Sequence, residues 1–122
     1  MRYNDEQGQV WDREPLNVVA RDDSGGVVGG LIGEVNLRWL FVSALWVDER
    51  VRGSGIGSRL IREAEAQARE RGCLGIYLDT FSFQARPFYE RVGFTLFGEL
   101  PDCPPGGAKY YLYKRVDPAS AR

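Results

Sequence analysis

The stretch ERVRGSGIGSRL at residues 49–60 places three glycines, Gly53, Gly55 and Gly57, within five residues. Three alternating glycines cost backbone entropy, so a simple connection between two elements does not explain them. An almost continuously apolar run, WLFVSALWV at 39–47, precedes the stretch, and a segment of helical periodicity follows it. The pattern therefore predicts a strand, a turn and a helix, with bare backbone in the turn lying close to a ligand.

The helix after the turn is predicted from a stripe of apolar residues four apart, Ile56, Leu60, Ala64 and Ala68, with Arg and Glu on the opposite face. The N-terminus of such a helix directs backbone N–H groups and the positive end of its dipole outward, where an anion binds well. Arg52 adds charge-assisted hydrogen bonds at the same place. This chemistry fits a phosphate or pyrophosphate best.

Three phosphate-binding patterns compete for this turn. The Walker pattern needs a lysine after its last glycine, where this chain has Ser58 and Arg59. The dinucleotide pattern fails at its third glycine, because Ser58 occupies that position. The third pattern, Arg or Gln, two residues, Gly, one residue, then Gly or Ala, is satisfied throughout by RGSGIG at 52–57. A glycine-rich turn without a ligand remains the structural alternative.

The rest of the chain predicts one mixed α/β domain over residues 1–122. Short strands are expected at 16–20, 27–35 and 74–81, and the run at 39–47 is expected at the centre of the sheet, covered on both faces. A short helix follows, with Ser82 as a possible N-cap, Pro87 in its first turn and Gly93 at its end. FTLFGEL and KYYLYKR predict two final strands, so helices should flank a single-layer mixed sheet.

Composition excludes several functions. A formal net charge of −1 shows no electrostatic footprint for nucleic acid. The chain has no histidine and only two cysteines, which argues against Ser-His-Asp chemistry, a disulfide scaffold or a metal site. No apolar run reaches membrane length and the start is unlike a signal peptide, so we expect no membrane association and a cytoplasmic location.

The turn RGSGIG is similar to the acyl-CoA pyrophosphate loop of the GNAT N-acetyltransferase superfamily. ALWVDERVRGSGIGSRLI resembles the whole strand-loop-helix unit of that family, and ARPFYERVGF at 85–94 resembles its second signature, an Ala and a Tyr on a short helix before Gly-Phe. Together the likeness covers roughly residues 16–115. It implies a GNAT-like acyl-CoA fold with a mostly antiparallel sheet.

The resemblance also implies acetyl-CoA as the acetyl donor and assigns roles residue by residue. Backbone groups of Leu45 and Val47 would bind the pantetheine arm, and Tyr89 would lie near the CoA sulfur as general acid. The pyrophosphate would be held by the loop residues Arg52, Gly53, Ser54, Gly55, Ile56, Gly57 and Ser58.

This chain departs from the family pattern at several points. Little precedes Leu16, Ser82 stands where many relatives have Asn, and Trp39 stands where several have a catalytic Glu. Gly107 stands where members of a small bacterial subset tend to have His. Because the shortened N-terminus would leave an apolar face or strand edge uncovered, we expect a homodimer, with KYYLYKR near the contact.

The group that removes the proton from an amine acceptor is left open by the sequence. Asp79 and Glu34 are the candidates, and bulk water is a third possibility. The main functional hypothesis is an acetyltransferase acting on a primary amine by direct attack; the alternative is a non-catalytic acyl-CoA binder. Aromatic residues are expected to be mostly core or pocket wall, namely Trp39, Trp46, Phe81, Phe83, Phe88, Tyr110, Tyr111 and Tyr113.

Overall fold

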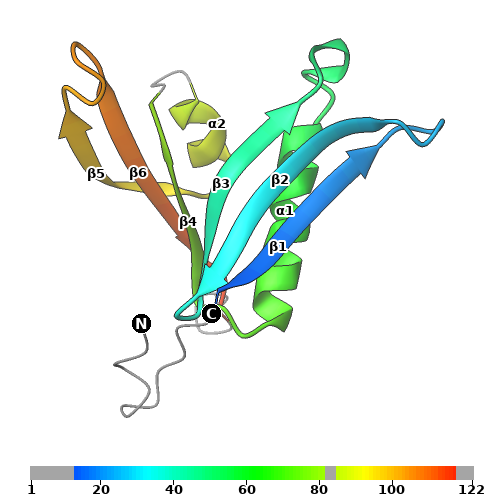
Figure 1. Cartoon of the computed structure of the whole chain (residues 1–122), viewed down its shortest axis with the longest axis horizontal. Helices are drawn as coiled ribbons and strands as arrows, with labels where there is room; N and C mark the ends of the chain where they lie inside the picture. Colours follow the sequence, from blue (N-terminus) through cyan, green and yellow to red (C-terminus); the bar gives the residue numbers. More distant parts are fainter. Residues whose placement is uncertain (1–12, 82–84, 118–122) are drawn as a thin grey trace.

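The computed structural model describes residues 13–81 and 85–117, which form one six-stranded sheet with two α-helices (Figure 1). The strand order across the sheet is β1-β2-β3-β4-β6-β5. In chain order the elements are β1 (Glu14–Arg21), β2 (Val27–Asn36), β3 (Trp39–Val47), the 3-10 turn η2 (Glu49–Val51), α1 (Ile56–Glu70), β4 (Gly75–Thr80), α2 (Arg86–Arg91), β5 (Thr95–Pro101) and β6 (Ala108–Arg115).

The sheet is mixed and mostly antiparallel, as the sequence predicts. Only β3 and β4 run parallel, and α1 connects them, because two parallel strands need a crossover. The pairs β1–β2, β2–β3, β4–β6 and β5–β6 are antiparallel. The glycine-rich turn therefore lies at the point where the chain leaves the middle of the sheet to form this crossover.

Strands β3 and β4 separate part of the way along their length, which corrects the expectation for residues 39–47. Their pairing runs only from Trp39 to Val42 on β3, and beyond it the two strands diverge (Figure 1). Past this point Ser43, Ala44 and Trp46 are exposed, so β3 is not covered on both faces. The apolar composition of the run does not distinguish a strand inside a core from one that borders an open gap.

Both helices pack on the same face of the sheet. The helix α1 buries the apolar stripe predicted for it, with Leu60 and Ala64 in contact with the core. From α2 and the turn after it, Phe88, Tyr89 and Val92 pack against that same core. The helix boundaries agree with the prediction, since α1 ends before Gly72 and Pro87 lies in the first turn of α2. Ser82 lies outside the described residues.

The aromatic residues predicted to be mostly core or pocket wall lie chiefly at cavity walls. Among the described aromatic residues only Phe94 is buried, and Trp46 and Phe81 are 46% and 57% exposed. Of the predicted set, Trp39, Trp46, Phe81 and Phe88 line cavities, and Phe88 and Tyr110 pack against the core. Phe83 lies outside the described residues. The core is built instead from aliphatic side chains such as Leu16, Leu31, Leu40, Ile76 and Leu112.

Candidate active site

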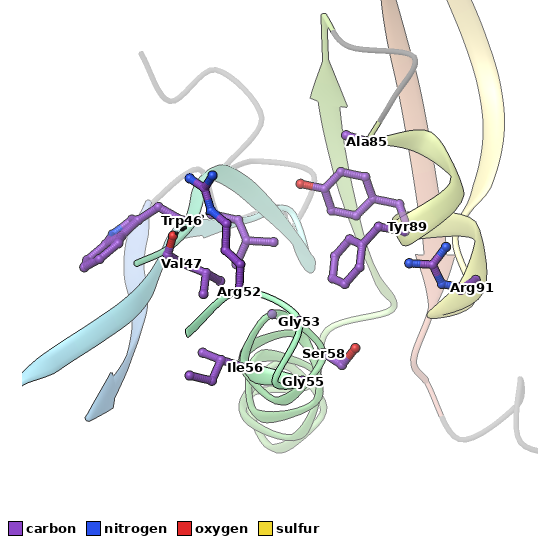
Figure 2. Close-up of a pocket in the computed structure, with 13 residues that line it drawn as sticks. Trp46, Val47, Arg52, Gly53, Gly55, Ile56, Ser58, Ala85, Tyr89 and Arg91 are labelled. Carbon is purple, nitrogen blue, oxygen red and sulfur yellow. Dashed lines mark hydrogen bonds between the residues drawn. The ribbon is translucent and has the colours of Figure 1, made fainter. Parts of the chain in front are cut away.

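A cavity of about 910 Å³ opens where β3 and β4 diverge, between the start of α1 and the inner side of α2 (Figure 2). It contains all but one of the cofactor-binding residues predicted from the sequence. Its lining residues are Leu45, Trp46, Val47, Arg52, Gly53, Gly55, Ile56, Gly57, Ser58, Ala85, Phe88, Tyr89 and Arg91.

The loop that leads into α1 needs glycine for its backbone conformation. Gly53 and Gly55 have φ angles of 85° and 87°, in the left-handed region that disfavours other residues. A Cβ atom built at either position would have no atom of the described chain within 4 Å. The loop thus presents bare backbone to open space beside the cavity, as the sequence led us to expect.

The start of α1 offers several backbone donors without acceptors. The helical hydrogen bonds begin only with Arg59 N–H, which donates to the Gly55 carbonyl at 3.1 Å. Gly55 supplies no side-chain cap, and the first turn contains no acidic residue. Within residues 13–81 and 85–117 no backbone acceptor is paired with the N–H groups of Gly53, Gly55, Ile56, Gly57 and Ser58. Such a set of donors is suited to an anion.

Ser54 is the loop residue that faces elsewhere. Its backbone N–H donates to the Val51 carbonyl at 3.3 Å, and its hydroxyl donates to the same oxygen. It does not line the cavity. The structure therefore uses this side chain to hold the turn after η2 in shape.

Two arginines give the cavity positive charge, and no carboxylate lines it. Arg52 Nε donates to the Val47 carbonyl at 3.3 Å, and its guanidinium lies 4.0 Å from Glu49 at an exposed site. Arg91 reaches the cavity from α2 (Figure 2). The sequence analysis missed Arg91, although its spacing of three from Phe88 places both on one helical face.

Leu45 and Val47 turn backbone groups toward the gap between the strands. Next to them, Asp48 N–H donates to the Val28 carbonyl of β2 at 2.8 Å. Successive residues of an antiparallel strand alternate in the direction of their backbone hydrogen bonds. The backbone N–H and C=O groups of Leu45 and Val47 therefore point away from β2. The bond from Arg52 to the Val47 carbonyl fits this direction.

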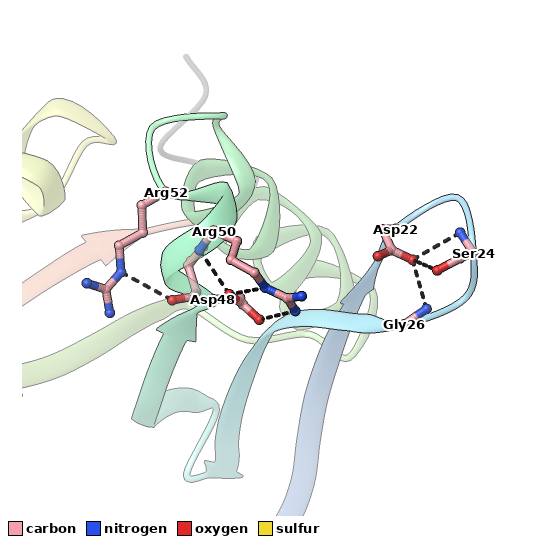
Figure 3. A network of polar contacts seen from close by, with 7 residues as sticks. Asp22, Ser24, Gly26, Asp48, Arg50 and Arg52 are labelled. Carbon is pink, nitrogen blue, oxygen red and sulfur yellow. Dashed lines mark hydrogen bonds and ion pairs between the residues drawn. The ribbon is translucent and has the colours of Figure 1, made fainter.

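Asp48 and Arg50 fix the chain just before the loop (Figure 3). Asp48 Oδ1 accepts hydrogen bonds from Arg50 N–H at 2.9 Å and Arg50 Nε at 3.1 Å, and Oδ2 accepts from Arg50 Nη2 at 2.8 Å. The Arg50 side-chain bonds, followed by the backbone bond, lower the pKa of Asp48 from 3.8 to about 2. Arg50 thus faces Asp48, whereas Arg52 points to the cavity side.

We expect Asp48 to titrate near pH 2 in an NMR measurement of its carboxyl carbon. A lowered pKa means that the carboxylate stabilises the fold above its ordinary value of 3.8 and loses this effect as pH falls toward 2. Arg50→Ala should raise the midpoint toward 3.8 while the backbone bond remains. Asp22 is the reference, because its pKa is lowered chiefly by Ser24 and Gly26 and least by Arg50, so its midpoint should move much less than that of Asp48. An unchanged Asp48 midpoint in Arg50→Ala would contradict the assignment.

Tyr89 stands between this cavity and a second one of about 320 Å³, which lies in the gap between β3 and β4. Tyr89 and Leu45 line both cavities. The Tyr89 ring projects from α2 toward β3 and packs on Phe88 and Phe94, with ring centroids 5.2 Å and 5.8 Å away (Figure 2). Burial raises the pKa of the phenol above 10.0, so it keeps its proton at neutral pH. No hydrogen-bond partner of its hydroxyl occurs among the described residues.

Asp79 lines the second cavity, as expected for a group near Tyr89. Lys109 Nζ lies 4.0 Å from Asp79 Oδ2. The ammonium group also lies over the rings of Phe81 and Tyr111, at 5.5 Å and 5.4 Å from their centroids. The charge of Asp79 is the main cause of a raised pKa at Lys109. No local sequence pattern indicates this pairing, because β6 meets β4 only in the folded sheet.

Glu34, the other candidate base, lies apart from Tyr89. It lines a third cavity of about 290 Å³ and forms an ion pair with Arg13 at 3.3 Å. Of the two carboxylates, only Asp79 shares a cavity with Tyr89. Across the described residues no group of three or more metal-ligating side chains could hold a metal ion. None of the described helices is long and apolar enough to cross a membrane.

Comparisons with known proteins agree with this geometry. The family model for the acetyltransferase (GNAT) family matches residues 2–94. The chain is 47% identical over 111 residues to blasticidin-S acetyltransferase of Streptomyces morookaense. This match covers 88% of this chain and 82% of the relative. A crystal structure of an acetyltransferase from Agrobacterium tumefaciens superposes with a TM-score of 0.81 at 42% identity, covering 93% of this chain and 82% of the other.

A more distant likeness shows the same fold with a ligand in place. A Bacillus anthracis protein described as a streptothricin acetyltransferase, solved with acetyl coenzyme A, has a TM-score of 0.78 at 24% identity. The match covers 91% of this chain and 68% of that one. The diverging parallel strands, the glycine loop at the start of α1 and the matches to a family model and to near relatives lead to one conclusion: the chain belongs to the GNAT family of acetyltransferases.

Proposed function

We propose that this protein transfers the acetyl group of acetyl-CoA to a primary amine by direct attack of the amine on the thioester. The position of Tyr89 carries this proposal. One side of the phenol faces a cavity with unpaired N–H groups and two guanidiniums, and the other faces a cavity with a carboxylate. The acetyl donor and the amine acceptor, entering from these two sides, would meet beside the O–H group of Tyr89.

The cavity of about 910 Å³ has the donors that the CoA moiety needs. Pyrophosphate oxygens would accept hydrogen bonds from the loop N–H groups, with Arg52 and Arg91 supplying charge. Backbone groups of Leu45 and Val47 would bind the pantetheine amides, in the manner of an added strand. When bound, acetyl-CoA supplies the activated acetyl group.

The roles of the two polar side chains follow from their protonation states. Asp79 would bind the incoming ammonium and take its proton, directly or through water, so that the neutral amine can attack. A bond then forms between the amine nitrogen and the acetyl carbon as the carbon–sulfur bond breaks, and the nitrogen, now positively charged, loses its second proton to solvent to leave the amide. Tyr89 O–H would donate its proton to the departing sulfur and recover one from solvent. The raised pKa of Tyr89 favours this role, because the phenol keeps at neutral pH the proton that it donates.

The acceptor is proposed to be a small-molecule amine. The relative that is 47% identical bears the name blasticidin-S acetyltransferase, which favours an antibiotic of that kind. The test is CoA release, followed with a thiol reagent, on a panel of blasticidin S, aminoglycosides, polyamines, amino acids and peptide N-termini. We expect one class to turn over, with a product heavier by one acetyl group. Acetyl-CoA binding without turnover on any amine would favour the non-catalytic binder.

We also propose that the protein is a homodimer. The edge strand β5 exposes Phe97 and Leu100 at 56% and 47%, and exposed apolar edges are usually covered. Light scattering at micromolar concentration should give about twice the chain mass of 13.7 kDa. Phe97→Glu should shift the mass toward that of one chain. A single 13.7 kDa species in the unaltered protein would rule the dimer out.

A further inference from the structure

The face of the sheet opposite α1 and α2 bears a group of aromatic side chains at the end where β3 and β4 are still paired. The rings of Phe41 and Tyr77 lie 5.0 Å apart between centroids, and those of Trp39 and Tyr77 lie 6.3 Å apart. These three residues line the cavity of about 290 Å³, together with Arg13, Glu34, Asn36 and Leu37. We call this cavity the aromatic pocket.

The aromatic pocket lies in line with the cavity that holds Asp79 and Tyr89. Tyr77 lines the aromatic pocket, and Asp79, two residues farther along β4 and on the same face, lines the other cavity. Two residues of a strand span about 7 Å. One extended molecule of modest length can therefore reach from the carboxylate of Asp79 to the rings of the aromatic pocket.

Asn36, which lines the aromatic pocket, carries a polar atom without a partner. Its Oδ1 is buried, and it accepts no hydrogen bond within the described part of the chain. A buried acceptor without a donor is unfavourable, and native proteins rarely leave one unless a ligand or water completes it. The carboxylate of Glu34 lines the same pocket, so acceptors from two side chains lie beside rings whose own donors are the Trp39 N–H and the Tyr77 O–H.

Arg13 shows what kind of group suits these acceptors. Its guanidinium, planar and rich in N–H donors, lies 3.3 Å from the Glu34 carboxylate at a largely exposed position. Such an exposed pair is weak and can be exchanged for an equivalent partner. Planar groups also stack on aromatic rings, and a positive charge adds a cation–π attraction.

We propose that the aromatic pocket binds the head group of the amine acceptor, and that this head group is planar and donates N–H hydrogen bonds. This inference rests on the proposed acetyl transfer. The acceptor would place its primary amine beside Asp79 and its head group about 7 Å away, between the rings and Asn36 Oδ1. Guanidinium groups and amino-substituted aromatic rings share this chemistry.

Binding of four amines of similar length separates the two parts of the proposal. Agmatine has a planar N–H-donating head, 4-phenylbutylamine a planar head without donors, 1,5-diaminopentane donors without a plane, and pentylamine neither. Calorimetric titration without acetyl donor should show agmatine binding at least about tenfold more tightly than the other three. A fifth probe, 4-(4-aminobutyl)aniline, has a neutral planar donor head; its affinity relative to agmatine tells whether the charge matters.

Variants of the chain assign the preference to the pocket. Asn36→Leu should abolish the preference for agmatine over 4-phenylbutylamine while leaving the affinity for pentylamine unchanged. The matched control is Asn17→Leu on β1, which lines none of the three cavities. Glu34→Gln keeps an acceptor oxygen but removes the charge, so it should weaken the binding of agmatine several-fold. It serves as the second test if Asn36→Leu does not fold.

The outcomes separate this inference from the proposed function. Equal binding of all probes, or a preference that survives both substitutions, overturns the assignment of the head group. A preference lost in Asn36→Leu, but with no acetylation of agmatine when acetyl-CoA is added, supports the pocket and argues against the proposed transfer to such acceptors.

Discussion

Tyr89→Phe should reduce turnover at least tenfold and leave the affinity for acetyl-CoA nearly unchanged. The substitution removes one oxygen, and general acid help of this kind typically contributes about 10²–10⁴-fold. Packing should survive, since the ring contacts with Phe88 and Phe94 do not involve the hydroxyl. Steady-state kinetics on the best amine of the panel, with calorimetry for acetyl-CoA, measures both quantities.

The control for this substitution is Tyr110→Phe. Tyr110 is also partly buried against the core but lines none of the three cavities. The Tyr110→Phe variant should therefore keep the full turnover rate. If Tyr89→Phe is as fast as the unaltered protein, Tyr89 has no part in proton transfer. A fall in acetyl-CoA affinity that accounts for the whole loss would assign the residue to binding instead.

Arg52→Ala should weaken acetyl-CoA binding by about 10- to 150-fold, the range for loss of hydrogen bonds to a charged group. Among the described residues, the partners of the Arg52 guanidinium are the Val47 carbonyl at 3.3 Å and the Glu49 carboxylate at 4.0 Å. Little therefore competes with a phosphate for its guanidinium. Calorimetric titration of acetyl-CoA gives the dissociation constant directly.

Arg50→Ala is the matched control, because it removes the same charge two residues away. Arg50 faces Asp48 and does not line the cavity (Figure 3). Its loss should change the dissociation constant much less than the loss of Arg52, because the bond from Arg50 N–H to Asp48 still holds the chain before the loop and the long-range attraction is screened by salt. Equal losses in both variants would mean that general positive charge, and not a contact from Arg52, holds the ligand. Arg91→Ala then measures the contribution from α2.

Much of the local structure around the glycine loop could be predicted from the sequence because its determinants are local. A helix start is visible in the apolar stripe of α1, and the conformations of Gly53 and Gly55 are a property of the loop itself. The unpaired N–H groups follow from the geometry of any helix N-terminus. The short helix α2 could also be predicted, since Pro87 at its start and the Gly-Phe after its end lie within one short stretch of sequence.

The acceptor side depends on contacts between segments distant in the chain. Lys109 and Asp79 are brought together only by the pairing of β4 with β6, and Arg13 and Glu34 by the pairing of β1 with β2. A sequence pattern records neither strand order nor register. For the same reason the sequence could not tell which aromatic residues belong to the core and which to a pocket wall, and several of them are exposed on the sheet.

The sequence by itself determined that a glycine-rich loop joins a strand to an amphipathic helix, because each part of that unit is specified within a few residues. Only the tertiary structure decided where β3 leaves β4. The pairing of β3 with β4 ends at Val42, next to an irregularity in the β2–β3 pairing that leaves Ser43 without a register partner on β2. The separation opens the gap in which Tyr89 lies between two cavities.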